Sequence, residues 1–215
     1  MNHDPRIVGR AAAIRIDNLD TDQIMPKQFL RGIDKKGLAD GVLHDLRFAP
    51  DGAPRAGFVL NRPADRPVRV LLGGANFGCG SSREHAVWGL LQFGIEAVVA
   101  PSFGEIFHAN AMQNGLLLVM LPRTDVEALM ADADAQPDAD VRIDVAALRI
   151  ASAQVDVAFE LGERQRRKFL EGTDDIGLTL ARKHAIDAFA AAHWARQPWL
   201  RDVAAITRRR LDAKS

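Results

Sequence analysis

A glycine-rich stretch between an expected strand and an expected helix constrains the fold of this chain more than any other segment. The apolar run 68–72, which only Arg69 interrupts, precedes it and predicts a buried strand. The stretch reads Gly-Gly-Ala-Asn-Phe-Gly-Cys-Gly-Ser-Ser-Arg-Glu-His over residues 73–85. Ser81 and Glu84 have the spacing of a capping box, so we expect a helix to begin at residue 82. A strand, a glycine turn and a helix in this order indicate an α/β fold.

The junction has the features of an anion-binding site. The N–H groups at a helix N-terminus carry partial positive charge, and Arg83 adds a planar set of donors suited to a carboxylate or a phosphate. The stretch lacks the Gly-Lys-Ser/Thr ending of a P-loop, and Arg83 stands where a dinucleotide fingerprint needs glycine. From the residues alone, a functional anion site and a plain capped turn remain open alternatives.

The middle of the chain predicts a mostly parallel core sheet with flanking helices. Its pattern gives, in order, strand 68–72, helix 82–93, strand 97–100, helix 103–114 and strand 116–121. Ser102 and Glu105 have the spacing of a capping box at the start of the second helix. Apolar strands without alternation, joined by helices, are typical of a parallel sheet covered on both faces. A first strand is expected within 6–16, and short apolar runs between 141 and 159 predict a small added antiparallel β layer. The segment 34–67 is rich in Gly, Pro and Asp, and we interpret it as an excursion over an active site or a subunit interface.

Composition bounds the classes of function. Lys plus Arg equals Asp plus Glu, 28 each, so no overall field favours nucleic acid or an anionic membrane. The arginine run 208–210 is interpreted as a solvated helix end rather than a nucleic-acid site. No apolar run is long enough to span a membrane, and a cytoplasmic location is expected. Cys79 is the single cysteine, and one thiol cannot hold an iron–sulfur cluster.

Three motifs resemble the aconitase family, and within it the small subunits of 3-isopropylmalate dehydratase. They are Phe77-Gly-Cys-Gly-Ser-Ser-Arg-Glu-His-Ala86, Asp20-Thr-Asp-Gln-Ile-Met-Pro26 and Ala100-Pro-Ser-Phe103. The resemblance runs from about residue 14 to residue 198. It implies one swivelling β/β/α domain over residues 1–198, followed by a C-terminal tail over 199–215.

The resemblance also implies an activity and a partner. The small subunits of 3-isopropylmalate dehydratase work with a large subunit as two-chain hydro-lyases, which interconvert 2-isopropylmalate and 3-isopropylmalate in leucine biosynthesis. A [4Fe–4S] cluster is then expected on a separate large subunit, with no cofactor bound by this chain. The expected assembly is a heterodimer or heterotetramer acting on a small hydroxy-dicarboxylate.

The family's roles fall on four residues of this sequence. The resemblance implies that Ser81 is the catalytic base and that Asp22 orients a catalytic group on the large subunit. It implies that Ser82 is a substrate or support contact and that Arg83 is a carboxylate ligand. Arg31 lies on the loop that is mobile in the family, and it is either a solvent-exposed charge or a second carboxylate ligand. A serine is a weak base, so we expect N–H donors of the helix N-terminus, together with Arg83, to stabilise its alkoxide.

Two alternatives stay open. A related dehydratase could act on homoaconitate, citramalate or dimethylmalate, and the loop Phe29 to Ile33 would decide between these substrates. A protein of another class would be a binding module that holds a small anion without chemistry. Asp20 and Asp22 also allow a purely structural interpretation, since an Asp-x-Asp pair usually forms a turn.

Overall fold

A mixed seven-stranded sheet, in the order β4-β3-β2-β1-β5-β6-β7, forms the centre of the larger of two compact units. The computed structural model describes residues 5–30, 36–62 and 66–213, and it contains two compact units, Met1–Asp174 and Asp175–Ser215. The strands, all in the first unit, are β1 (Arg6–Ile14), β2 (Val68–Gly73), β3 (Ala97–Ala100), β4 (Leu117–Met120), β5 (Asp140–Asp144), β6 (Arg149–Ala151) and β7 (Asp156–Ala158). β1 to β4 pair in parallel, whereas β5 pairs antiparallel with β1 and continues into β6 and β7. The expected α/β fold class is confirmed, and its antiparallel strands extend the same sheet.

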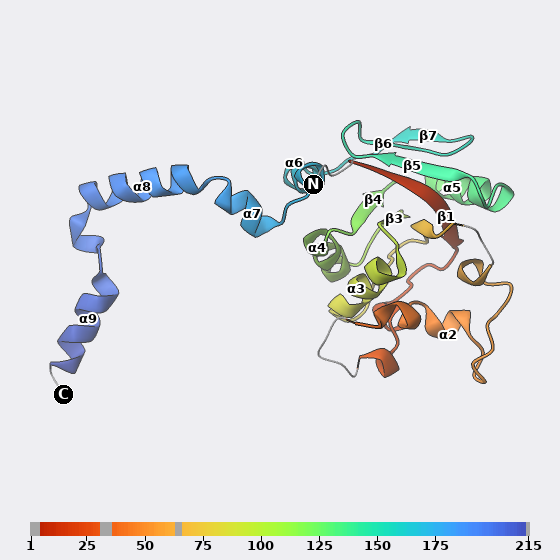
Figure 1. Ribbon diagram of the computed structural model, residues 1–215, viewed down its shortest axis with the longest axis horizontal. Coiled ribbons are helices and arrows are strands. Elements are labelled where there is room, and N and C mark those ends of the chain that lie inside the picture. The colour runs from red at the N-terminus through yellow and green to blue at the C-terminus, as the bar shows by residue number, and fades with distance from the viewer. Residues whose placement is uncertain (1–4, 31–35, 63–65, 214–215) are drawn as a thin grey trace. The chain divides into compact units, whose positions relative to one another are not determined.

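Helices cover both faces of the sheet. α3 (Glu84–Phe93) and α4 (Glu105–Asn114) lie on one side of the parallel strands, and α5 (Arg123–Ala135) lies on the other (Figure 1). The alternation of a strand explains how one segment supplies both cores: in β2, Leu71 packs on the α3 side, while Val70 and Leu72 pack on the α5 side. Because both faces are buried, β3 and β4 are apolar throughout, as the sequence predicted, whereas β2 contains Arg69 and β1 contains Arg6 and Arg10.

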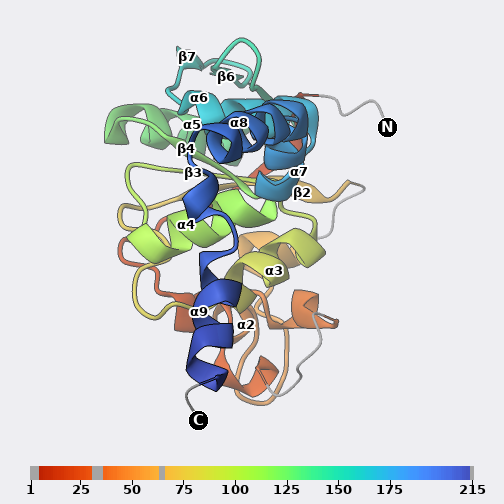
Figure 2. The same cartoon turned by 90° about the vertical axis from the view of Figure 1, so that its left-hand side faces the viewer.

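The segment between β1 and β2 contains short helices, and its expected role over an active site or an interface remains a prediction. It forms the short helices α1 (Thr21–Ile24), α2 (His44–Arg47) and the 3₁₀ helices η1 (Lys27–Phe29), η2 (Leu38–Gly41) and η3 (Val59–Asn61). Leu38, Val42 and Leu43 are buried in the core that contains α3. Figure 2 shows α2 beyond α3, at the end of the first unit away from β6 and β7. Its short apolar groups therefore close one end of the hydrophobic core.

The predicted helix starts were wrong. α3 and α4 begin at Glu84 and Glu105, and neither is capped by the expected serine. The hydroxyl of Ser102 instead accepts a hydrogen bond from the backbone N–H of Asn76 (2.8 Å). A capping box does form at α1, where Asp20 caps the helix and Gln23 reaches back to the Asp20 backbone.

The rest of the chain is helical. α6 (Glu163–Glu171) ends the first unit, and the second unit contains α7 (Asp175–Leu180), α8 (Lys183–Arg196), the 3₁₀ helix η4 (Pro198–Leu200) and α9 (Val203–Asp212). The expected division at residue 198 falls within this second unit and remains a prediction. No helix in the described part of the chain has the length and apolarity that a membrane span requires.

Candidate active site

The loops that follow β1, β2 and β3 meet at the carboxyl edge of the parallel strands. The backbone N–H of Gly78 donates to Leu19 O (2.7 Å), and that of Thr21 donates to Cys79 O (2.9 Å). The loop after β3 pairs with the other side of the glycine-rich stretch. This edge is the usual place for a ligand site in open α/β sheets. The loops after β1 and β3 thus hold the glycine-rich stretch, which is the loop after β2, between them by short backbone hydrogen bonds.

Two glycines allow the stretch to take this path. Gly78 and Gly80 have φ angles of +74° and +91°, in the left-handed region that side chains disfavour. A Cβ on Gly78 would also lie 2.3 Å from Cγ of Phe107, so the position excludes any side chain. The glycines turn the chain so that residues 81–83 come back toward α1.

Ser81 meets side chains of α1 after this turn. Its Oγ lies 3.2 Å from Oγ1 of Thr21 and 3.4 Å from Oδ1 of Asp22. Thr21 Oγ1 also donates to the carbonyl oxygen of Ser81 (3.0 Å). Ser81 itself is exposed, whereas Thr21 is buried beneath it. The structure therefore presents one accessible hydroxyl supported from below by a hydroxyl and a carboxylate.

Arg83 forms an ion pair with Asp22 through Nη1 and Oδ1. The Arg83 side chain is only 20 % exposed and that of Asp22 is 42 % exposed, so the pair lies at the border of the protein. Nη1 is buried, and its contact with Asp22 lacks the alignment of a hydrogen bond. The pair holds the guanidinium beside Ser81, where it can face a bound carboxylate.

The Ser81 hydroxyl does not occupy the position that the capping pattern predicted. Arg83 is the N-cap residue of α3, and its backbone N–H donates to Ser81 O (2.8 Å). This tight turn places Ser81 ahead of the helix and directs its hydroxyl to α1. Within the described part of the chain, side chains rather than helix N–H groups contact Ser81 Oγ. The expected ring of N–H donors was therefore wrong.

An asparagine at the end of α4 anchors the start of α3. Asn114 Nδ2 donates to Oε1 of Glu84 (2.6 Å), and the indole N–H of Trp88 donates to Oδ1 of Asn114 (3.0 Å). Glu84 follows Arg83 directly, so this network fixes the backbone from which the guanidinium extends.

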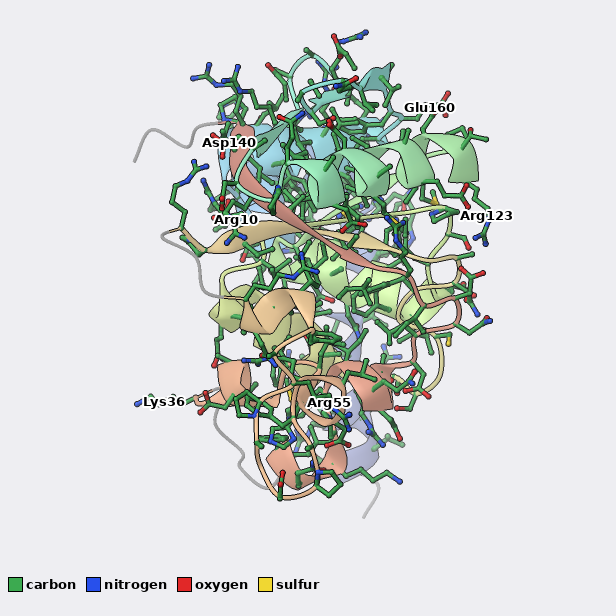
Figure 3. All side chains as sticks on the ribbon, turned by 90° about the vertical axis from the view of Figure 1, so that its right-hand side faces the viewer. Arg10, Lys36, Arg55, Arg123, Asp140 and Glu160 are labelled. Atoms are coloured by element: carbon green, nitrogen blue, oxygen red, sulfur yellow. The ribbon has the colours of Figure 1, made fainter. Side chains whose placement is uncertain are left out.

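A second anchor holds the loop after β1. Asp17 accepts hydrogen bonds from Nη2 of Arg123 (3.0 Å) and from the backbone N–H of Ala75 (2.7 Å). These two hydrogen bonds hold the pKa of the Asp17 carboxyl below its ordinary value, and the bond from Arg123 has the larger effect. Figure 3 shows Arg123 on the side of the molecule opposite Arg10 and Asp140. The anchor thus belongs to the same edge of the sheet as Ser81.

The structure brings together most of the residues singled out in the sequence. Ser81, Arg83 and Asp22 are in contact, and Ser82 is exposed next to them. Arg31 lies outside the described residues. Sequence reasoning missed Thr21, although it stands between Asp20 and Asp22 in a quoted motif. A threonine in a turn carries no signal that it will be buried against a serine from a distant segment.

Comparisons with known proteins agree with this geometry. The family model described as aconitase C-terminal domain matches residues 5–124, and the model for the C-terminal domain of the 3-isopropylmalate dehydratase small subunit matches residues 175–203. The first match, with the sheet and its glycine-rich corner, defines the class as the aconitase swivel domain. The chain belongs to the family of 3-isopropylmalate dehydratase small subunits, because it is similar to its members over nearly all its length.

The similar proteins include curated sequences and a solved structure. The 3-isopropylmalate dehydratase small subunit 1 of Chromobacterium violaceum is 59 % identical and covers 96 % of this chain and 97 % of its own length. The small subunit of Rhodospirillum centenum is 47 % identical, with 90 % and 96 % covered. A crystal structure of 3-isopropylmalate dehydratase from Methanocaldococcus jannaschii is 29 % identical with a TM-score of 0.60, covering 85 % of this chain and 98 % of that one.

Proposed function

We propose that this chain, as a small subunit of a two-chain hydro-lyase, helps to interconvert 2-isopropylmalate and 3-isopropylmalate in leucine biosynthesis. The observation that carries the proposal is the exposed Ser81 hydroxyl in contact with Asp22 and beside Arg83. The reaction and the pathway follow from the names of the similar proteins, which are small subunits of that dehydratase. These three side chains offer a hydroxyl, a carboxylate and a guanidinium, which are the groups that such a reaction needs from the subunit that holds no metal.

Each side chain has a role that its position supports. Elimination of water requires a base for the proton on carbon and cations for the carboxylates, and the exposed Ser81 Oγ is placed to take that proton. Arg83 binds a substrate carboxylate through its planar donors, and Ser82 contacts the substrate beside it. Asp22 holds Arg83 and Ser81 and, by our proposal, orients a group of the large subunit. Arg31 is proposed as the second carboxylate ligand from outside the described residues.

The iron–sulfur cluster does not fit the donor set of this chain. Cys79 is the single cysteine, and its thiol contacts Asn18 O (3.3 Å). Over residues 5–30, 36–62 and 66–213, no three His, Cys, Asp or Glu side chains gather in a way that could hold a metal. We propose that the large subunit holds the [4Fe–4S] cluster, whose iron would supply the Lewis acid for the leaving hydroxyl.

Co-expression with a cluster-bearing large subunit tests the proposal. Size-exclusion chromatography with light scattering should show a heterodimer or heterotetramer. The purified complex should turn over 2-isopropylmalate faster than homoaconitate, citramalate or dimethylmalate. Faster turnover of one of these other acids would replace the proposed substrate. A chain that forms no complex and supports no turnover would be a binding module instead.

A further inference from the structure

Thr21 is a buried polar residue that the proposed roles leave unexplained. In the part of the chain that the structure describes, the buried polar side chains are Arg10, Thr21 and Asp132. Arg10 donates to backbone carbonyls, and Asp132 accepts from a backbone N–H. Thr21, which is 1 % exposed, instead contacts the proposed base. Its hydroxyl is therefore the buried polar group that faces the candidate active site.

The backbone fixes the Thr21 hydroxyl in place. Thr21 is the first residue of α1, its N–H donates to Cys79 O (2.9 Å), and its carbonyl accepts from Met25 N–H (2.9 Å). A β-branched side chain has few rotamers, so Oγ1 has little freedom to leave Ser81. Oγ1 is held 3.0 Å from the Ser81 carbonyl oxygen and 3.2 Å from Ser81 Oγ.

Counting protons shows what these two distances allow. A threonine hydroxyl has one proton and can donate one hydrogen bond at a time. While Ser81 is protonated, Thr21 donates to the Ser81 carbonyl, and the Ser81 proton points to Thr21 Oγ1 or to Asp22 Oδ1. Once Ser81 has lost its proton, Oγ needs a donor, and an ionised Asp22 has none to give. Rotation about the Cβ–Oγ1 bond then lets Thr21 donate to Ser81 Oγ.

We propose that Thr21 is a positioning residue whose hydroxyl moves its hydrogen bond from the Ser81 carbonyl to Ser81 Oγ when the serine loses its proton. The proposal rests on the proposed function, in which Ser81 is the base. In dehydration, the Ser81 alkoxide takes the proton from the substrate carbon and becomes a hydroxyl. In rehydration, the hydroxyl returns that proton to carbon and becomes the alkoxide again. Thr21 supports the charged form in each cycle.

Two substitutions separate the hydroxyl from the shape of the side chain. Thr21→Val keeps the branched shape and removes the O–H, whereas Thr21→Ser keeps the O–H. In the complex with the large subunit, Thr21→Val should lose about 10- to 100-fold in kcat, the usual cost of one hydrogen bond to a charged group. Its KM should change less than about twofold, and the acidic limb of its pH–rate profile should move to higher pH. Thr21→Ser should keep kcat within about threefold.

Controls distinguish this proposal from the proposed function. The exposed Thr124 on α5 offers a matched Thr→Val change, which should leave kcat unaltered. Ser81→Ala is measured alongside: normal turnover there would refute the base itself. An inactive Ser81→Ala with a Thr21→Val complex at normal kcat would overturn the role of Thr21 alone. Thr21→Ser turnover as slow as that of Thr21→Val would also overturn it. Should Thr21→Val not assemble, Thr21→Ala removes the same hydroxyl and is judged by the same criteria.

Discussion

Asp22 and Arg83 form an ion pair across the junction between α1 and the glycine-rich stretch. The two residues come from distant parts of the sequence and meet because the loop after β1 runs beside residues 75–79. The pair places a guanidinium next to the exposed Ser81 hydroxyl. The geometry of the candidate site therefore depends on a contact that neither segment makes alone.

Arg83→Lys tests the planar donors of the guanidinium. An ammonium keeps the charge but cannot bind a carboxylate in two parallel hydrogen bonds, so kcat/KM of the reconstituted complex should fall by at least about 10-fold. Steady-state kinetics with 2-isopropylmalate measures the change. Arg149→Lys is the matched control, since Arg149 forms a comparable ion pair with Asp156 in the β6–β7 hairpin. Equal kcat/KM values for the two variants would remove Arg83 from the substrate site.

Gly78→Ala tests whether packing, and not only backbone conformation, requires glycine in the stretch. Gly52 also has a positive φ, but a Cβ there meets no atom within 4 Å. Gly52→Ala should cost about 1–2 kcal/mol from the backbone alone. Gly78→Ala should cost about 2 kcal/mol more in free energy of unfolding, because its Cβ overlaps Phe107. Urea unfolding of both variants gives the difference, and equal values would contradict the packing argument.

The anchor at Asp17 predicts a dependence of stability on pH. Its pKa is lowered in the folded protein, so the contribution is present above the unfolded pKa, near 3.8, and is lost as the pH falls through the folded pKa. Asp17→Asn should therefore lower the free energy of unfolding at pH 7, and the difference from the unaltered protein should vanish in acid.

Arg123→Gln examines the cause of this effect. Arg123 contributes the larger share of the lowering, so the Asp17 pKa should move up toward its ordinary value in an NMR titration. The backbone N–H of Ala75 remains and should keep part of the shift. An Asp17 pKa that does not change would show that Arg123 has no part in it.

The fold was more predictable from the sequence than the details of the site. Strand 97–100 was predicted with the bounds that β3 has, because a buried parallel strand is apolar along its whole length. The helix starts were missed at Ser81 and Ser102, because their hydroxyls bond to distant segments rather than to their own helices. A capping pattern shows only which side chains near a helix start could accept its backbone N–H groups. It contains no information about hydrogen-bond partners from elsewhere in the chain.

The residues of the candidate site could be predicted only where they lie in a recognisable sequence motif. Ser81, Ser82 and Arg83 are adjacent in the sequence, and the family resemblance pointed to Asp22. The burial of Thr21 against Ser81, and the pairing of Asp22 with Arg83, follow from backbone contacts between two loops. Such contacts depend on how β1 and β2 pair, which residue patterns in either segment alone cannot specify.

The turnover of a Ser81→Ala complex tests the central claim most directly. The variant should assemble with the large subunit and bind 2-isopropylmalate, because the ion pair between Asp22 and Arg83 does not involve the serine hydroxyl. Its kcat should fall by about 10²- to 10⁴-fold, the usual loss when a general base is removed. A matched Ser152→Ala change in the loop after β6 should have no effect on kcat. Turnover by the Ser81→Ala complex at the rate of the unaltered complex would contradict the account.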